Sequence, residues 1–318
     1  MVSEKKSLLK RILITVICLI LTFCIVSMAA TKIVYDHIFT RVDEPEISVP
    51  DTLSHMVENR TEKEYYSGEN LLSGYLYESG IRDRYNSLIV LAPGFNAGAD
   101  SYLWQISELN NRGWSVFAFD PTGCYSSQGE STVGFAQEII DLDNTLKYIE
   151  KNNRFGYNDI VIMGHSRGGY AACCNLAYEH NVSAVISVSG INSAMDGIMG
   201  ASVNYVGGLA YLNYGFLWLY QTMLFGADTV NLSADEEISK SDVPVLIVHG
   251  EQDKQVPLSR YSIISQKDKI KSKNVEYYGC SQPESNGHTD LLFDSDGTAN
   301  DKLFEQIERF LKQSAVKN

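Results

Sequence analysis

A short segment flanked by glycines carries the clearest chemistry in this 318-residue chain. Residues 164–168 read G-H-S-R-G, after the apolar run Asp159–Met163 and before a stretch typical of a helix. A sharp strand-to-helix turn here holds the serine hydroxyl clear of the sheet and needs glycine where a Cβ would clash. The helix N-terminus favours developing negative charge. The segment therefore predicts Ser166 as a nucleophile, and an ordinary glycine-rich turn is the alternative.

A serine hydroxyl needs a base to remove its proton, so the chain must supply a histidine. Among its six histidines, His288 lies in the polar stretch 285–290, between the last predicted strand and the last predicted helix. A loop at this position can bring the imidazole over the serine. His249 ends a predicted strand and is expected to be structural. We predict His288 as the general base.

A carboxylate must orient that imidazole and stabilise its cation. Asp253 follows the end of the strand that closes with His249, and it is the best placed acid in the chain. Glu251, two residues earlier, is the alternative.

Acyl transfer also requires hydrogen-bond donors for a tetrahedral oxyanion. The stretch Ala92–Asn96 follows a strand expected to lie beside the Ser166 strand. The backbone N–H groups of Phe95 and Arg167 are the predicted pair, without a required role for the Arg167 side chain. An ordinary turn containing proline and glycine is the alternative for the first loop.

The elements around these residues alternate between strand and helix, after a hairpin predicted over residues 62–78. Strands are predicted at 87–92, 114–119, 159–163, 184–188, 243–249 and 275–278, and helices at 100–112, 133–151, 166–179, 258–265 and 300–312. This alternation predicts an α/β fold with a mostly parallel sheet and helices on both faces. Residues 191–241 interrupt it and are predicted to form a small cap. Its aromatic residues are candidates for a lid or acyl pocket: Tyr205, Tyr211, Tyr214, Phe216, Trp218, Tyr220 and Phe225.

Three motifs in this order resemble the α/β-hydrolase superfamily over residues 62–312. They are Pro93-Gly94-Phe95, Asp120 followed by Gly123 and the stretch 126–129, and the G-H-S-R-G-G of residues 164–169. The branch they resemble is serine aminopeptidase-like and includes monoglyceride lipases and feruloyl esterases. The resemblance implies a covalent acyl-enzyme, no metal or organic cofactor, and the chain order Ser166, Asp253, His288. Residues 120–125 lack the Arg and His usual in that branch, which weakens any inference about substrate.

The N-terminus predicts a membrane segment. Residues 12–30 carry no charge and span about 28 Å as a helix, close to the hydrocarbon thickness of a bilayer. Basic residues precede this run, so residues 1–11 are expected to be cytoplasmic, 12–30 a signal anchor, 31–61 a juxtamembrane stalk and 62–318 an extracytoplasmic catalytic domain. Small residues at 27–30 also fit a cleaved signal peptide, which would release the domain. A buried core helix is the third interpretation.

Composition excludes other classes. The net charge of −13 argues against a nucleic-acid partner, which needs clustered Lys and Arg. The cysteines have no metal-site spacing. Cys124 and Cys280, both in predicted loops, are the pair that would suit a disulfide in an exported protein. Oligomeric state is open.

These residues predict a membrane-anchored serine hydrolase acting on small ester substrates. An aminopeptidase acting on short peptides is the nearest alternative, with Asp235, Glu236 and Glu237 available to hold a substrate ammonium. Acyl transfer to an alcohol other than water is a further alternative. A non-catalytic surface-binding protein represents a different class.

Overall fold

The computed structural model describes residues 2–44, 49–81 and 86–315. These residues form one sheet of eight strands in the spatial order β1-β2-β4-β3-β5-β6-β7-β8. Strand β2 runs antiparallel to β1 and β4, and the remaining neighbours are parallel. The strands are β1 Thr61–Ser67, β2 Asn70–Tyr77, β3 Ser87–Ala92, β4 Ser115–Phe119, β5 Asp159–His165, β6 Ala184–Val188, β7 Val245–Gly250 and β8 Val275–Cys280. The predicted hairpin and the mostly parallel sheet are confirmed.

The central strands are buried on both faces, because their side chains alternate between two separate apolar clusters. In β3, Leu88 and Val90 enter one cluster, and Ile89 and Leu91 enter the other. Apolar residues at consecutive positions are therefore what this strand requires.

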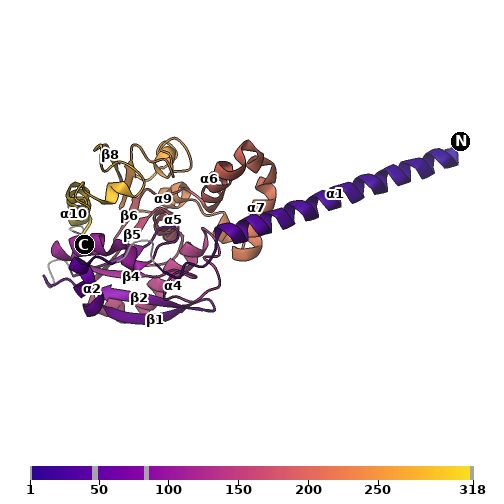
Figure 1. Cartoon of the computed structure of the whole chain (residues 1–318). Helices are drawn as coiled ribbons and strands as arrows, with labels where there is room; N and C mark the ends of the chain where they lie inside the picture. Colours follow the sequence, from indigo (N-terminus) through magenta and orange to yellow (C-terminus); the bar gives the residue numbers. More distant parts are fainter. Residues whose placement is uncertain (1, 45–48, 82–85, 316–318) are drawn as a thin grey trace.

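Helices cover both faces of the sheet (Figure 1). Helices α2, α3 and α10 pack in one cluster, whereas α4 and α5 pack in the other. The helices are α1 Val2–Ile38, α2 Ser54–Asn59, α3 Leu103–Asn111, α4 Gln137–Lys151, α5 Arg167–Cys174, α6 Ala194–Val206, α7 Tyr214–Phe225, α8 Ala227–Val230, α9 Ala234–Lys240 and α10 Asp301–Ala315.

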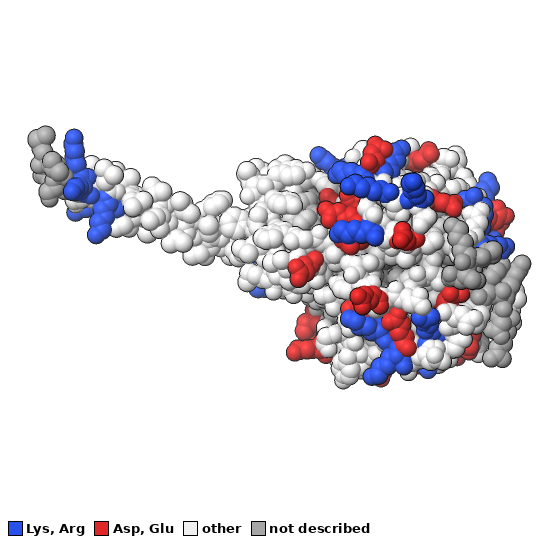
Figure 2. Space-filling model, turned by 180° about the vertical axis from the view of Figure 1, so that it is seen from behind, with Lys and Arg blue, Asp and Glu red and all other residues white. Residues whose placement is uncertain are grey.

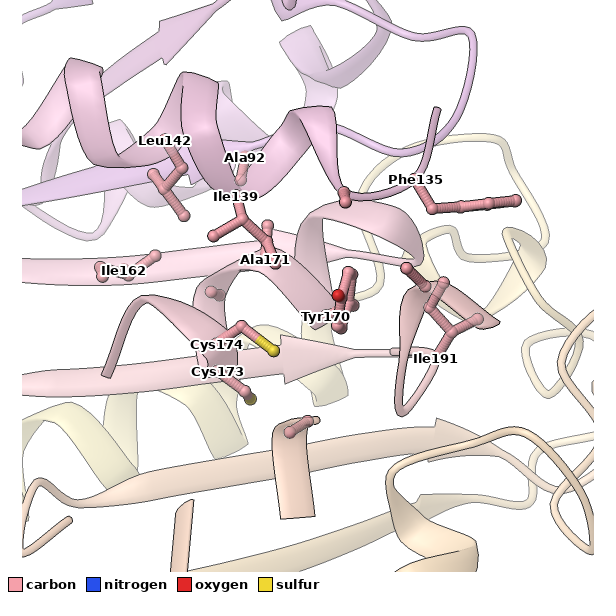
Figure 3. Close-up of a cluster of buried hydrophobic side chains, with 14 of the residues drawn as sticks. Ala92, Phe135, Ile139, Leu142, Ile162, Tyr170, Ala171, Cys173, Cys174 and Ile191 are labelled. Carbon is pink, nitrogen blue, oxygen red and sulfur yellow. The ribbon is translucent and has the colours of Figure 1, made fainter. Parts of the chain in front are cut away.

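Helix α5 begins at the predicted nucleophile and is buried along its whole length. Figure 3 shows Ala171 and Cys174 of α5 among Ile139 and Leu142 of α4 and Ile162 of β5. Because α5 is enclosed on every side, the position of its first residue is fixed by the core.

Helix α1 is long and apolar enough to cross a bilayer over Lys5–Ile38. It projects from the domain as a rod, and its C-terminal half contacts the domain (Figure 1). Tyr35 and Phe39 are almost fully buried, at 2% and 1% exposure. The predicted stalk covers residues 31–61, and its first residues belong to α1 and the turn after it. These residues pack onto the domain, because their aromatic side chains fill the core. Residues 45–48 of that segment lie outside the described residues.

The interval 191–241 contains α6, a 3-10 segment Gly207–Asn213, α7, α8 and α9. The prediction of a helix at residues 258–265 is wrong. Tyr261 has φ 68°, which a right-handed helix does not allow, and only the 3-10 turn Ile264–Gln266 forms. Cys124 and Cys280 are both buried, free thiols.

Candidate active site

Ser166 stands at a strained turn between β5 and α5. Its φ of 55° and ψ of −114° lie in a region that L-residues rarely adopt. A Cβ added to Gly164 would lie 2.1 Å from the Gly168 carbonyl oxygen, and one added to Gly168 would lie 2.1 Å from the Ala92 oxygen. The turn therefore needs both glycines, as the sequence motif predicts. Its backbone is held by the Ser166 N–H, which donates to the Val188 carbonyl at 2.8 Å.

The structure brings the three predicted side chains together from different loops. His288 Nε2 lies 2.9 Å from Ser166 Oγ, and His288 Nδ1 lies 2.7 Å from Asp253 Oδ2. His288 is 8% exposed and Asp253 is 6% exposed, so the chain shields this relay from bulk water. Glu251, the alternative acid, is exposed and makes no such contact with His288.

Three groups in addition to His288 hold the Asp253 carboxylate. The backbone N–H groups of Gln255 and Val256 donate to Oδ1 at 2.9 and 2.8 Å, and His249 Nε2 lies 3.2 Å from Oδ2. Burial raises the pKa of Asp253, but hydrogen bonds from His249 and His288 outweigh it and hold the pKa well below its usual range. The carboxylate therefore stays ionised and ready to stabilise an imidazolium.

The two predicted oxyanion donors follow two adjacent strands, β3 and β5. Ala92, the last residue of β3, pairs with Gly164 of β5, so the loop after Ala92 lies beside the Ser166 turn. In that loop the Gly94 N–H donates to Tyr102 Oη at 2.9 Å, and Phe95, the next residue, lines the same cavities as Ser166. Arg167 is the first residue of α5, where backbone N–H groups have no intrahelical acceptor.

A buried network joins this loop to His288. Tyr102 Oη lies 2.8 Å from His165 Nδ1, and His165 Nε2 lies 3.0 Å from the His288 carbonyl oxygen. Burial lowers the pKa of His165 to about 3, so the ring is neutral. A carbonyl only accepts, so Nε2 carries the proton and the Tyr102 hydroxyl donates to Nδ1. The sequence motif contained His165 but gave no sign of this role.

The Arg167 side chain turns away from Ser166 into the core. Its Nη2 lies 2.7 Å from Glu138 Oε2, and both side chains are fully buried. Burial raises the pKa of Glu138 to about 8, against the opposing effect of the adjacent guanidinium. The guanidinium also lies 5.7 Å from the centroid of the Phe95 ring. This pair thus ties α5 to α4 directly behind the predicted oxyanion site.

Two cavities of about 220 and 280 Å³ meet at Ser166 and His288, and Phe95 and Gln255 line both. The smaller one is also lined by Tyr102, Tyr125, Leu292 and Phe293, and the larger one by Phe135, Asp196, Gly200, Lys254 and Tyr261. Two pockets at one nucleophile fit the two sides of a scissile bond. Of the predicted cap aromatics, the six with described side chains line neither cavity, and the Tyr205 side chain lies outside the described residues.

The segment after α1 completes the site in a way that sequence reasoning missed. Arg41 donates to the carbonyls of Tyr125, Ser127 and Gly129 at 2.8 to 3.0 Å, and so orders the loop that carries Tyr125 into the smaller cavity. The Phe39 ring lies 5.5 Å from that of Phe95. These contacts join residues more than 50 positions apart, so local sequence patterns gave no signal for them.

Within the part of the chain that the structure describes, no group of three or more His, Cys, Asp or Glu is placed to hold a metal ion. The predicted nucleophile, base and acid lie together beyond the carboxyl ends of β5, β7 and β8.

Comparison with known proteins agrees with this fold. Residues 87–210 match the family model for the alpha/beta hydrolase fold. The esterase Pf2001 of Pyrococcus furiosus has a TM-score of 0.64 and 19% identity, over 86% of this chain and 98% of that one. The ferulic-acid-bound Est1E of Butyrivibrio proteoclasticus has a TM-score of 0.61 and 18% identity, over 80% of this chain and 99% of that one. The chain therefore has the α/β-hydrolase fold.

Two curated relatives match over part of their length. Human protein ABHD12B is 29% identical over 57% of this chain and 49% of its own length. A proline iminopeptidase of Saccharolobus solfataricus is 30% identical over 39% of this chain and 42% of its own length. The chain thus matches about half the length of these relatives.

Proposed function

We propose that this chain is a membrane-anchored serine hydrolase that cleaves carboxylic esters through Ser166, His288 and Asp253. The observation that carries the proposal is the pair of distances, 2.9 Å from Ser166 Oγ to His288 Nε2 and 2.7 Å from His288 Nδ1 to Asp253 Oδ2. These distances suit proton transfer from a serine located at a strained turn.

In the first half-reaction, Ser166 Oγ attacks the substrate carbonyl carbon while its proton passes to His288 Nε2. The oxygen that becomes negatively charged accepts hydrogen bonds from the N–H groups of Phe95 and Arg167. The tetrahedral intermediate then collapses, and His288 returns the proton to the departing alkoxide. The products are an alcohol and an acyl group bound to Ser166.

In the second half-reaction, a water molecule takes the place of the alcohol. His288 accepts a proton from this water as it attacks the acyl carbon, and then returns a proton to Ser166 Oγ as the acid leaves. Asp253 remains ionised throughout, because its hydrogen bonds from Gln255, Val256 and His249 are already in place.

Helix α1 supports the membrane part of the proposal. It is long and apolar enough to span a bilayer, and Lys5, Lys6, Lys10 and Arg11 gather at its N-terminal end (Figure 2). By the positive-inside tendency this end is cytoplasmic and the hydrolase domain is extracytoplasmic.

Kinetics with a short aryl ester test the proposed residues. We expect Ser166→Ala and His288→Ala to lower kcat by roughly a million-fold, and Asp253→Asn by roughly ten-thousand-fold, because these side chains act as a unit. The matched control is Glu251→Gln, which removes an exposed carboxylate two residues from Asp253 and should keep full activity. Normal turnover by Ser166→Ala would contradict the proposal.

A peptidase of the aminopeptidase type is the second candidate, and Asp196 favours it. This carboxylate lines the larger cavity, where it could hold a substrate ammonium. Asp235 and Glu237, weighed for that role from sequence, are bonded to Asn192 and Lys240 respectively and line neither cavity. Comparing aryl esters with aminoacyl anilides separates the candidates. Anilide turnover that depends on Asp196 would favour the peptidase.

A further inference from the structure

The cap has an uncharged stretch that exposes large apolar side chains. Residues 197–227 contain no Asp, Glu, Lys or Arg. The surface that we name the cap face consists of Leu209, Leu212, Tyr214, Leu219, Met223 and Leu224, of which Leu212 is 76% and Met223 70% exposed. An exposed apolar group of this size on a soluble domain indicates an interaction surface.

The cap face lies on α7, the helix that packs on α1, and on the 3-10 segment just before it. Phe216 of α7 makes an edge-to-face contact with Phe23 of α1, with ring centroids 5.9 Å apart. Nearby, Asn213 Nδ2 donates to Thr31 Oγ1 at 2.6 Å. Figure 1 shows α7 beside the base of the α1 rod, and Figure 2 shows uncharged surface running from that rod onto the domain.

These contacts fix the depth of the cap relative to a bilayer. If residues 12–30 cross the hydrocarbon, Phe23 lies seven residues, or about 10 Å, inside its outer boundary. Phe216 is in contact with Phe23, so the start of α7 lies at that depth as well. Water-exposed charge on α1 resumes only at the ion pair of Lys32 with Asp36, which are 60% and 53% exposed.

We propose that the cap face is inserted in the outer leaflet of the bilayer that α1 crosses. The inference rests on the proposed membrane anchor. We assign lipid rather than a partner protein to the cap face, because this surface is continuous with α1 and carries no charge. A depth of about 5–10 Å is also the usual position of amphipathic elements lying in a bilayer interface.

This placement defines the class of substrate. The Tyr211 hydroxyl, next to the cap face, lies 3.0 Å from the Tyr261 hydroxyl, and Tyr261 lines the larger cavity with Ser166. Gly200 and Ala201 of α6 line the same cavity. The wall of the cavity therefore continues into the membrane-facing surface. An ester whose acyl chain is dissolved in the leaflet reaches Ser166 along this wall, and such lipid esters are the substrates we assign.

Fluorescence quenching tests the insertion independently of catalysis. The full chain, with Cys18→Ala and Cys24→Ala, receives one cysteine carrying an environment-sensitive dye and is reconstituted in phosphatidylcholine vesicles with brominated acyl chains. The test position is Leu212→Cys. Leu19→Cys, on exposed α1, and Tyr66→Cys, on exposed β1, are the positive and negative controls.

Quenching at positions 212 and 19 but not 66 is the expected result. Quenching at position 19 without quenching at 212 would overturn the inserted cap and keep the anchor. Absence of quenching at both would overturn the anchor and the cap insertion together. None of these outcomes depends on whether Ser166 is the nucleophile.

A second measurement tests the substrate class. The double variant Leu209→Glu, Leu212→Glu should cleave a long-chain ester held in vesicles about tenfold or more slowly, because two apolar contacts with hydrocarbon are lost. Its rate on a short water-soluble ester should stay within about twofold, because neither residue lines the cavities. Tyr66→Glu is the control for added charge. An equal loss on both esters, or no loss on either, would contradict the inference.

Discussion

His165 shows how one residue of the serine motif supports the site without touching the reaction. Its ring lies between Tyr102, which also accepts from the Gly94 N–H, and the backbone carbonyl of His288. The neutral ring thus links the oxyanion loop to the proposed general base. The same loop of His288 is held by the Ser189 hydroxyl, which donates to the His288 carbonyl at 3.1 Å.

The burial of His165 predicts how the free energy of unfolding depends on pH. Burial lowers the pKa of His165 from its ordinary value of 6.5 to about 3 in the folded chain. Below pH 6.5 the unfolded chain binds a proton at this position that the folded chain does not, so the folded state loses stability as pH falls. Relative to His165→Gln, the free energy of unfolding of the wild type should fall by about 1.4 kcal/mol per pH unit between pH 6 and 4.

Denaturant unfolding of both proteins at several pH values measures this difference. Using the difference removes the contributions of other buried groups, such as Asp120 and Glu138, that the two proteins share. A pH-independent difference would show that His165 titrates normally in the folded chain.

The three residues of the proposed triad could be singled out at this scale because their signals are local. The glycines beside Ser166 reflect a backbone that tolerates no Cβ, and Asp253 and His288 each follow a strand end. Arg41, His249 and Glu138 were missed as participants because their partners are set by packing and not by spacing. The sequence offered Glu251, two residues before Asp253, as the alternative acid, and the turn geometry separates the two because only Asp253 bonds to His288.

At the scale of elements, the strands were predictable and the connections were less so. Strand β6, Ala184–Val188, was predicted at its observed bounds, because it is a short apolar run buried on both faces. The helix predicted at 258–265 does not form. There Ser262 and Ser265 hydroxyls bond to nearby backbone carbonyls, which competes with helix formation.

The end of α1 is an element whose importance the sequence did not reveal. Phe39 contacts the rings of Phe95 and Phe135, at 5.5 and 5.4 Å, and both of these line the larger cavity. Through this contact the proposed anchor supports the wall of the active site. A protein truncated at residue 51 would lack this support.

Phe39→Ala should therefore lower the free energy of unfolding by about 3–5 kcal/mol, the usual cost of removing a buried aromatic ring. It should also lower activity, because Phe95 carries a proposed oxyanion donor. The matched control is Ile33→Ala, which truncates a 70% exposed side chain on α1, six residues before Phe39. Equal stability of the two variants would argue against a structural role for the end of α1.

At the scale of the whole molecule, the domain is attached to a rod whose far end carries a cluster of positive charge (Figure 2). A retained anchor and a cleaved signal peptide both place the domain outside the cytoplasm. They differ in whether the contacts of Phe23 and Thr31 with the cap persist in the mature protein.

Expression in intact cells distinguishes these states. We expect the full-length chain in the membrane fraction after alkaline washing, and we expect a membrane-impermeant serine-reactive probe to reach it without lysis. A shortened, soluble protein would indicate signal cleavage. Labelling only after lysis would contradict the proposed orientation.

The central claim is that Ser166 is the nucleophile, and labelling with a fluorophosphonate followed by peptide mapping tests it most directly. The account predicts one phosphonylated residue, Ser166, with labelling lost in Ser166→Ala and strongly slowed in His288→Ala. Labelling that persists in folded Ser166→Ala, or a folded wild type that is not labelled, would contradict it.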